Sequence, residues 1–105
     1  MKIIYPKNFA SSRNEVILQY CKGKKILHIG ATDAPYTKAK YQGEIGPLLY
    51  REIDKVCISQ LAIDIDTESI KFLSDKGNEF PNSQLIAFDM NRLQDLNFTP
   101  DVIVF

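Results

Sequence analysis

Residues 25–35 read KILHIGATDAP, an apolar run that stops at a single glycine and continues into small and polar residues. A continuous apolar run bounded by a turn is typical of a strand in a parallel sheet that is buried on both faces. The turn carries only Gly30, whereas turns that bind dinucleotides usually carry two or three glycines. The segment therefore predicts a parallel sheet and raises the question of which ligand the turn receives.

The overall composition is that of one ordinary globular domain. The chain has 105 residues, of which 45% are hydrophobic and 25% are charged. Thirteen basic residues balance thirteen acidic ones, so the summed charge gives no attraction to nucleic acid or to anionic membranes. We expect neither as a partner.

The chain also lacks the signals of membrane, secreted and metal-binding proteins. No apolar stretch approaches the roughly 20 residues that span a bilayer, and we expect a cytoplasmic protein. Cys21 and Cys57 are far apart in the sequence, and a single histidine leaves too few ligands for zinc. We predict two reduced, buried thiols and no metal site.

The flanking segments alternate between helical and strand patterns. Val16, Ile17 and Tyr20 recur at helical spacing before the first strand, whereas residues 31–47 are broken by glycine and proline. The predicted elements are a helix from Ser11 to Cys21 that is closed by Gly23, a strand from Lys25 to Ile29, a helix from Leu48 to Lys55, a strand from Gln60 to Ile65, a helix that follows Asp66 and stops at Gly77, a strand from Gln84 to Phe88, and a fourth strand that begins in DVIVF (101–105). This alternation predicts an α/β fold, a parallel sheet with helices on both faces and about four strands.

Three of the predicted strands end in groups that could serve a nucleoside. The first leads into the turn GATDA (30–34), the second ends at Asp64, and the third is followed by Asp89 and Met90. The carboxyl ends of parallel strands meet at one edge of the sheet, where ligands of such folds bind. Each acid taken alone is more often a turn or cap residue, and only their occurrence on successive strands points to a site.

The segments KKILHIGATDAP, LAIDIDTESIKFL and LIAFDMNRLQDLNFTPDVIVF resemble the first motifs and the fourth strand of the class I, Rossmann-like methyltransferases that use S-adenosylmethionine. More narrowly, LHIGATDAP with IDID resembles a bacterial subgroup whose loop reads His, apolar, Gly, small residue, Thr, Asp, Ala, Pro. The resemblance covers about residues 22–105 and implies one domain, residues 1–105. Within it, residues 1–21 are an amino-terminal extension and residues 22–105 are the half that binds S-adenosylmethionine.

The resemblance also implies roles for single residues. The turn that begins at Gly30 would pass under the methionine part of the cofactor, and its other members are Ala31, Thr32, Asp33 and Ala34. Asp64 would hold the ribose hydroxyls, and Ile65 would flank the adenine. Asp89 and Met90 would meet the adenine amino group and ring edge. Asp66 falls on a helix cap and should not touch the ligand.

His28 marks a departure from the family pattern. General members carry an acid two places before the first glycine, where it helps to hold the cofactor's amino group, and this chain carries His28 there. A protonated imidazole would repel an ammonium, so His28 must be neutral if it lies in the site. The alternative is a histidine at a strand end that is hydrogen-bonded to the backbone.

A second departure is length. Class I methyltransferases have seven strands, and the later ones supply the acceptor pocket, so the chain is expected to be the truncated, amino-terminal part of such a domain. We expect it to bind S-adenosylmethionine and to be inactive alone, with an unknown acceptor and no catalytic residue that can be named. The alternatives are a domain for NAD or a nucleotide sugar, which GxGxxG would favour but Thr32 and Pro35 do not, and an interaction module without a small ligand.

The fourth strand predicts self-association. In the family order this strand is interior, and in a chain without a fifth strand one of its edges would be open. Open apolar edges recruit other chains. We therefore expect a homo-oligomer formed through the edge near Val102 to Phe105.

Overall fold

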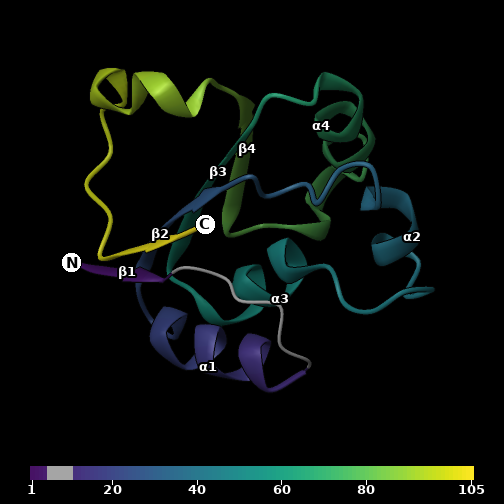
Figure 1. The fold of residues 1–105 in the computed structure, drawn as a ribbon, viewed down its shortest axis with the longest axis horizontal. Coiled ribbons are helices and arrows are strands. Elements are labelled where there is room, and N and C mark those ends of the chain that lie inside the picture. Colours follow the sequence, from purple (N-terminus) through teal and green to yellow (C-terminus); the bar gives the residue numbers. More distant parts are fainter. Residues whose placement is uncertain (5–10) are drawn as a thin grey trace.

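In the computed structural model, residues 1–4 and 11–105 are described, and they form one parallel sheet with helices (Figure 1). The sheet has five strands in the order β1-β5-β2-β3-β4. The strands are β1 (Lys2–Ile4), β2 (Lys25–Ile29), β3 (Ser59–Asp64), β4 (Ser83–Ala87) and β5 (Val102–Val104). The helices are α1 (Ser11–Cys21), α2 (Thr37–Tyr41), α3 (Leu49–Val56) and α4 (Thr67–Ser74), with 3-10 helices η1 (Gly77–Glu79) and η2 (Met90–Asp95). The α/β prediction is confirmed, and the sheet is compatible with a Rossmann-like domain.

Strand β2 is the centre of the sheet. Leu27 lies opposite Leu61 of β3 on one side and opposite Ile103 of β5 on the other. The chain moves outward from β2 to β3 and β4 and then returns to the far side of β2 with β5. The strand order therefore reverses at β2, and in open parallel sheets ligands bind beside such a reversal, outside the carboxyl ends of the strands.

The two faces of the sheet are covered differently. Ile26 packs with Ile17 of α1 and Ile53 of α3, which lie together on one side of the sheet (Figure 1). Successive residues of a strand point to opposite faces. Leu27 therefore faces the other way, where the cover comes from Leu93 of η2 and from Leu96 and Phe98 after it.

The buried thiols belong to the first of these faces. Cys21 ends α1 and Cys57 follows α3, and both are free and buried, as predicted. Burial raises the pKa of Cys21 to about 12 and that of Cys57 to about 11. Both thiols are therefore protonated at neutral pH, and a protonated thiol is a poor nucleophile. None of the helices in the described ranges is long and apolar enough to cross a membrane.

Strand β1 corrects the predicted sheet. Lys2 lies opposite Val102, and its backbone N–H donates to the Asp101 carbonyl at 2.9 Å. The edge of β5 that was expected to be open is therefore occupied by residues of the same chain, and that expectation was wrong. The amino-terminal extension forms strand β1 with residues 2–4 and helix α1 with residues 11–21. Residues 5–10 lie outside the described residues. The oligomeric state itself stays a prediction.

Deleting residues 1–4 should expose the edge of β5 and promote association. An unpaired strand edge offers backbone groups to another chain. We expect the shortened chain to show a larger, concentration-dependent mass by light scattering on a size-exclusion column than the full chain. Lys2→Ala is the control, because it removes the contact of Lys2 Nζ with the Tyr20 ring and leaves the strand backbone in place. Equal masses for all three proteins would show that the β5 edge does not drive association.

Candidate functional site

A cavity of about 280 Å³ lies at the carboxyl ends of β2, β3 and β4. Its walls come from the end of each strand and from the start of η2. The lining residues are Ile29, Gly30, Ile63, Asp64, Ile65, Phe88, Asp89, Met90 and Asn91. The cavity therefore lies at the edge of the sheet where the strand order predicts a ligand.

Five of the nine cofactor-binding residues predicted from the sequence line this cavity. They are Gly30, Asp64, Ile65, Asp89 and Met90. Four predicted residues do not line it. Ala31 and Thr32 are fully buried members of the turn, Asp33 is a partly exposed member of it, and His28 is buried on the opposite face of β2.

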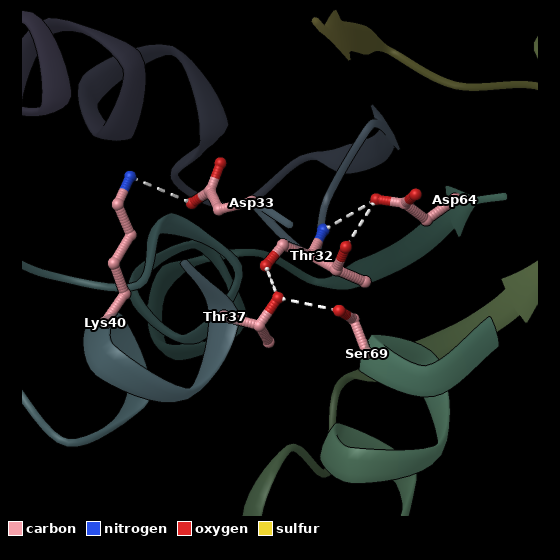
Figure 2. A network of polar contacts seen from close by, with 6 residues as sticks. All are labelled: Thr32, Asp33, Thr37, Lys40, Asp64 and Ser69. Atoms are coloured by element: carbon pink, nitrogen blue, oxygen red, sulfur yellow. Dashed lines mark hydrogen bonds and ion pairs between the residues drawn. The ribbon is translucent and has the colours of Figure 1, made fainter. Parts of the chain in front are cut away.

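The Asp64 carboxylate joins the cavity to the turn. Oδ2 accepts the backbone N–H of Thr32 at 3.0 Å and the Thr32 hydroxyl at 2.7 Å (Figure 2). Oδ1 accepts the backbone N–H groups of Ile65 at 2.8 Å and of Asp66 at 3.1 Å. A carboxylate offers about four lone-pair positions, so these four contacts use its acceptor capacity.

Hydrogen bonds also set the ionisation of this group. Burial raises the pKa of Asp64, but the hydrogen bonds from Thr32, Asp66 and Ile65 together outweigh burial and leave the pKa below its usual value. Hydrogen bonds to the charged form favour that form. Asp64 is therefore an anion at neutral pH, fixed in orientation by the chain around it.

The same turn is tied to helix α4. The Thr37 hydroxyl donates to the Thr32 carbonyl oxygen at 2.5 Å and lies 3.0 Å from the Ser69 hydroxyl (Figure 2). Asp66 accepts the Ser69 backbone N–H at 3.2 Å and also contacts its hydroxyl. Asp66 is thus the N-cap of α4, which confirms the role predicted for it, and it does not line the cavity.

Two residues in the turn have positive φ angles. Gly30 has φ 71° and Asp33 has φ 59°. Glycine adopts this region without a steric penalty, and aspartate is among the few other residues found there. The Asp33 carboxylate forms an ion pair with Lys40 of α2 at 3.3 Å, so the acid is held at the turn and is not aimed into the cavity (Figure 2).

Apolar side chains and one carboxylate stand at the mouth of the cavity. Ile65 is 74% exposed and Met90 is 47% exposed, although both are apolar. Asp89 accepts the Asn91 backbone N–H at 2.9 Å through Oδ1, and no hydrogen bond to its Oδ2 occurs within the described residues. The site therefore presents the exposed side chains of Ile65 and Met90 beside Asp89 Oδ2, which can accept a further hydrogen bond.

His28 belongs to a buried polar network on the helix-covered face. Its Nδ1 lies 2.8 Å from Oε1 of Gln60, whose amide nitrogen donates to the Tyr50 carbonyl at 3.1 Å. This orientation of the amide requires Nδ1 to carry the proton. The Gln60 nitrogen also lies 2.8 Å from the Ser83 hydroxyl, which contacts Asp54 at 2.7 Å. The histidine is thus hydrogen-bonded inside the fold, but to the Gln60 side chain and not to the backbone, as the alternative had it.

The imidazole is neutral in this setting. Burial lowers the pKa of His28 below its usual value, against the opposing effects of the Gln60 hydrogen bond and of the charges of Asp33 and Asp64. The side chain is only 4% exposed, so a proton on Nε2 would place an ion in the core.

A larger cavity lies at the opposite edge of the sheet. It has a volume of about 420 Å³ and is formed by the amino ends of β3 and β4 together with Asn97 and Phe98. No ionisable side chain lines it, and two of its lining residues, Gln60 and Ser83, already bond within the core. The smaller cavity combines charged acceptors with apolar walls and is therefore the better candidate for a functional site.

Sequence reasoning missed four residues of the candidate site. They are Ile29, Ile63, Phe88 and Asn91. Ile29, Ile63 and Phe88 face the side of the sheet that η2 covers. Their place at the ends of predicted strands was a usable signal, whereas Asn91 had none because the start of η2 was not foreseen. No group of three or more His, Cys, Asp or Glu that could hold a metal ion occurs within the described ranges.

Comparisons with known proteins do not assign the chain to a family. No family model matches its sequence, and no curated protein matches it either. The geometry of the cavity and the sequence resemblance are therefore the grounds on which a function can be argued.

The buried neutral histidine should make stability depend on pH. His28 binds its proton more readily in the unfolded chain than in the folded one, because its pKa is lowered on folding. The contribution of neutral His28 to the free energy of unfolding is therefore complete above about pH 6.5, and it is lost as the pH falls toward the lower pKa of the folded state. We expect the free energy of unfolding in urea to fall between about pH 7.5 and about pH 5.5.

The chain contains one histidine, so a His28→Gln variant isolates the effect. The variant will differ from the wild type in absolute stability, and only its pH slope is compared. We expect that slope to be much smaller than in the wild type over the same range. An unchanged slope would assign the pH dependence to other groups.

Proposed function

We propose that the chain binds S-adenosylmethionine, and its product S-adenosylhomocysteine, as the donor-binding part of a methyltransferase. The observation that carries this proposal is the cavity, which gathers Gly30, two carboxylates and two exposed apolar side chains from the ends of three successive strands. These groups stand in the order that the sequence resemblance implies for the methionine, ribose and adenine parts of the ligand.

The adenine end fits the mouth of the cavity. Ile65 and Met90 are apolar surfaces without cover, which suits the faces of a flat base. Asp89 has an oxygen without a partner in the described part of the chain, which could accept the amino group of adenine.

The ribose end requires an exchange of hydrogen bonds. Three of the four contacts of Asp64 come from backbone N–H groups, and the fourth comes from the Thr32 hydroxyl. The hydroxyl is the one donor that can rotate without moving the backbone. We infer that a ribose hydroxyl replaces it on Oδ2, and the Asp64 carboxylate is already oriented for that contact.

The chemistry of the reaction would come from the cofactor, whose sulfonium carries the methyl group to be transferred. The contribution of this chain would be to hold and orient the donor, because positioning supplies much of the rate of a direct displacement. The methyl acceptor is not identified by any group in the cavity, and we name no catalytic residue.

Calorimetric titration tests the ligand class. We expect the protein to bind S-adenosylhomocysteine and to bind NAD and a nucleotide sugar much more weakly, because Thr32 and Pro35 stand where a dinucleotide turn needs glycines. Preferential binding of NAD or of the nucleotide sugar would replace the proposal with a Rossmann domain of another specificity. Binding of none of the three would favour an interaction module.

The two acids of the IDID segment form a matched pair for mutation. Asp64→Asn should weaken S-adenosylhomocysteine binding by about 1.5–3 kcal/mol, the range for hydrogen bonds to a charged group. Asp66→Ala removes the cap of α4 and should lower the free energy of unfolding by about 1 kcal/mol without changing the affinity of the folded protein. Circular dichroism melts establish the folded fraction of each variant. Loss of affinity in Asp66→Ala alone would reverse the assignment.

A further inference from the structure

Helix α1 brings Arg13 to the carboxyl edge of the sheet. The helix ends at Cys21, and β2 begins at Lys25 at the amino edge, so the first turn of α1 lies toward the other edge. The charge of Arg13 lowers the pKa of His28, near the end of β2, and the charges of Asp33 and Asp64 raise it. Arg13 therefore belongs to the cluster of charged groups around the turn that begins at Gly30.

Arg13 has no partner in this cluster. Its Nε is buried without a hydrogen bond, and no ion pair of its guanidinium occurs within residues 1–4 and 11–105. Buried donors in folded proteins are almost always paired, and one that is not paired calls for an explanation such as an absent ion or ligand. Arg13 thus marks a position where an acceptor is missing.

Neither of the two acids nearby bonds to the guanidinium. Asp33 is paired with Lys40, and Asp64 already accepts four hydrogen bonds. The guanidinium is therefore a cation without an anionic partner in the described part of the chain. Its planar set of donors matches a carboxylate, which it can bind through two parallel hydrogen bonds.

The order of the strands places α1 on the side toward which the ligand would extend. The cavity spans the ends of β2, β3 and β4 on the face that η2 covers, whereas α1 packs against the other face and contacts β5, beyond β2. A ligand whose nucleoside fills the cavity and whose tail crosses the exposed Gly30 would run toward that side. The tail of S-adenosylmethionine is an amino acid that ends in a carboxylate.

We propose that Arg13 binds the carboxylate at the amino-acid end of the S-adenosyl ligand. This inference rests on the proposed function and extends the site to α1, which lies outside the part of the chain that resembles methyltransferases. It adds a residue that neither the resemblance nor the cavity includes, and it explains why a buried guanidinium nitrogen has no partner.

The test compares two ligands that differ in the amino-acid tail. S-adenosylhomocysteine carries the carboxylate, and 5′-methylthioadenosine lacks the whole amino-acid end. We expect Arg13→Met to weaken S-adenosylhomocysteine roughly 10- to 100-fold, and to change the affinity for 5′-methylthioadenosine less than about twofold. Lys22→Met is the matched control, because it removes an exposed cation just after the same helix, and it should change neither affinity.

Each other outcome has a definite meaning. Equal losses for both ligands would show that Arg13 supports the fold and not the carboxylate, and no change for either ligand would remove it from the site. If Arg13→Met does not fold, the wild type decides the matter. Decarboxylated S-adenosylmethionine should then bind at least about tenfold more weakly than S-adenosylmethionine, and equal affinities would overturn the inference.

Failure of the proposed function gives a different result from failure of this inference. A wild-type protein that binds neither S-adenosylhomocysteine nor 5′-methylthioadenosine would overturn both. A wild-type protein that binds both ligands equally would retain a nucleoside site and exclude a role for Arg13 at the carboxylate.

Discussion

The Asp64 carboxylate is the point through which the candidate site is held together. Its four hydrogen bonds connect the end of β3, the start of the turn at Thr32 and the entry into α4. Hydrogen bonds to an ionised acceptor are stronger than those between neutral groups, and a partly buried setting strengthens them further. The contacts of Thr37 with Thr32 and Ser69 extend this connection to α2. These hydrogen bonds thus fix the turn within the protein itself.

The structural role of Asp64 would constrain the ligand-binding role proposed for it. If Asp64 accepts a ribose hydroxyl, part of the affinity is offset by the hydrogen bond that the Thr32 hydroxyl gives up. The carboxylate needs no reorientation, because its backbone contacts persist, and this preorganisation limits the entropic cost of binding. Replacement of Asp64 would consequently affect the shape of the turn as well as the ligand, which is why Asp66, a neighbour with a purely capping role, is the useful comparison.

The sequence determined much of this fold through local signals. The helix Ser11–Cys21 and the strand Lys25–Ile29 were predicted with the observed bounds, because a run of helical spacing, a closing glycine and an apolar run mark them clearly. Strand β1 could not be predicted, since a three-residue strand forms only when the distant β5 offers a partner. The face on which His28 lies was equally hidden, because a strand that is apolar on both sides shows no alternation. Strand ends indicated four residues that line the candidate site, and the family resemblance indicated Ile65. Asn91 and the isolated Arg13 depend on tertiary packing.

The pairing of β1 with β5 has a consequence for how the molecule folds. Lys2 lies opposite Val102, so this contact joins segments separated by almost the whole chain. Long-range parallel pairing must offset the entropy of closing a large loop before it stabilises anything, and such contacts slow folding. During synthesis β1 would leave the ribosome before β5, its partner in the sheet, is made. The pairing of β1 with β5 is thus a late event, and strands β2, β3 and β4 are expected to form an earlier nucleus.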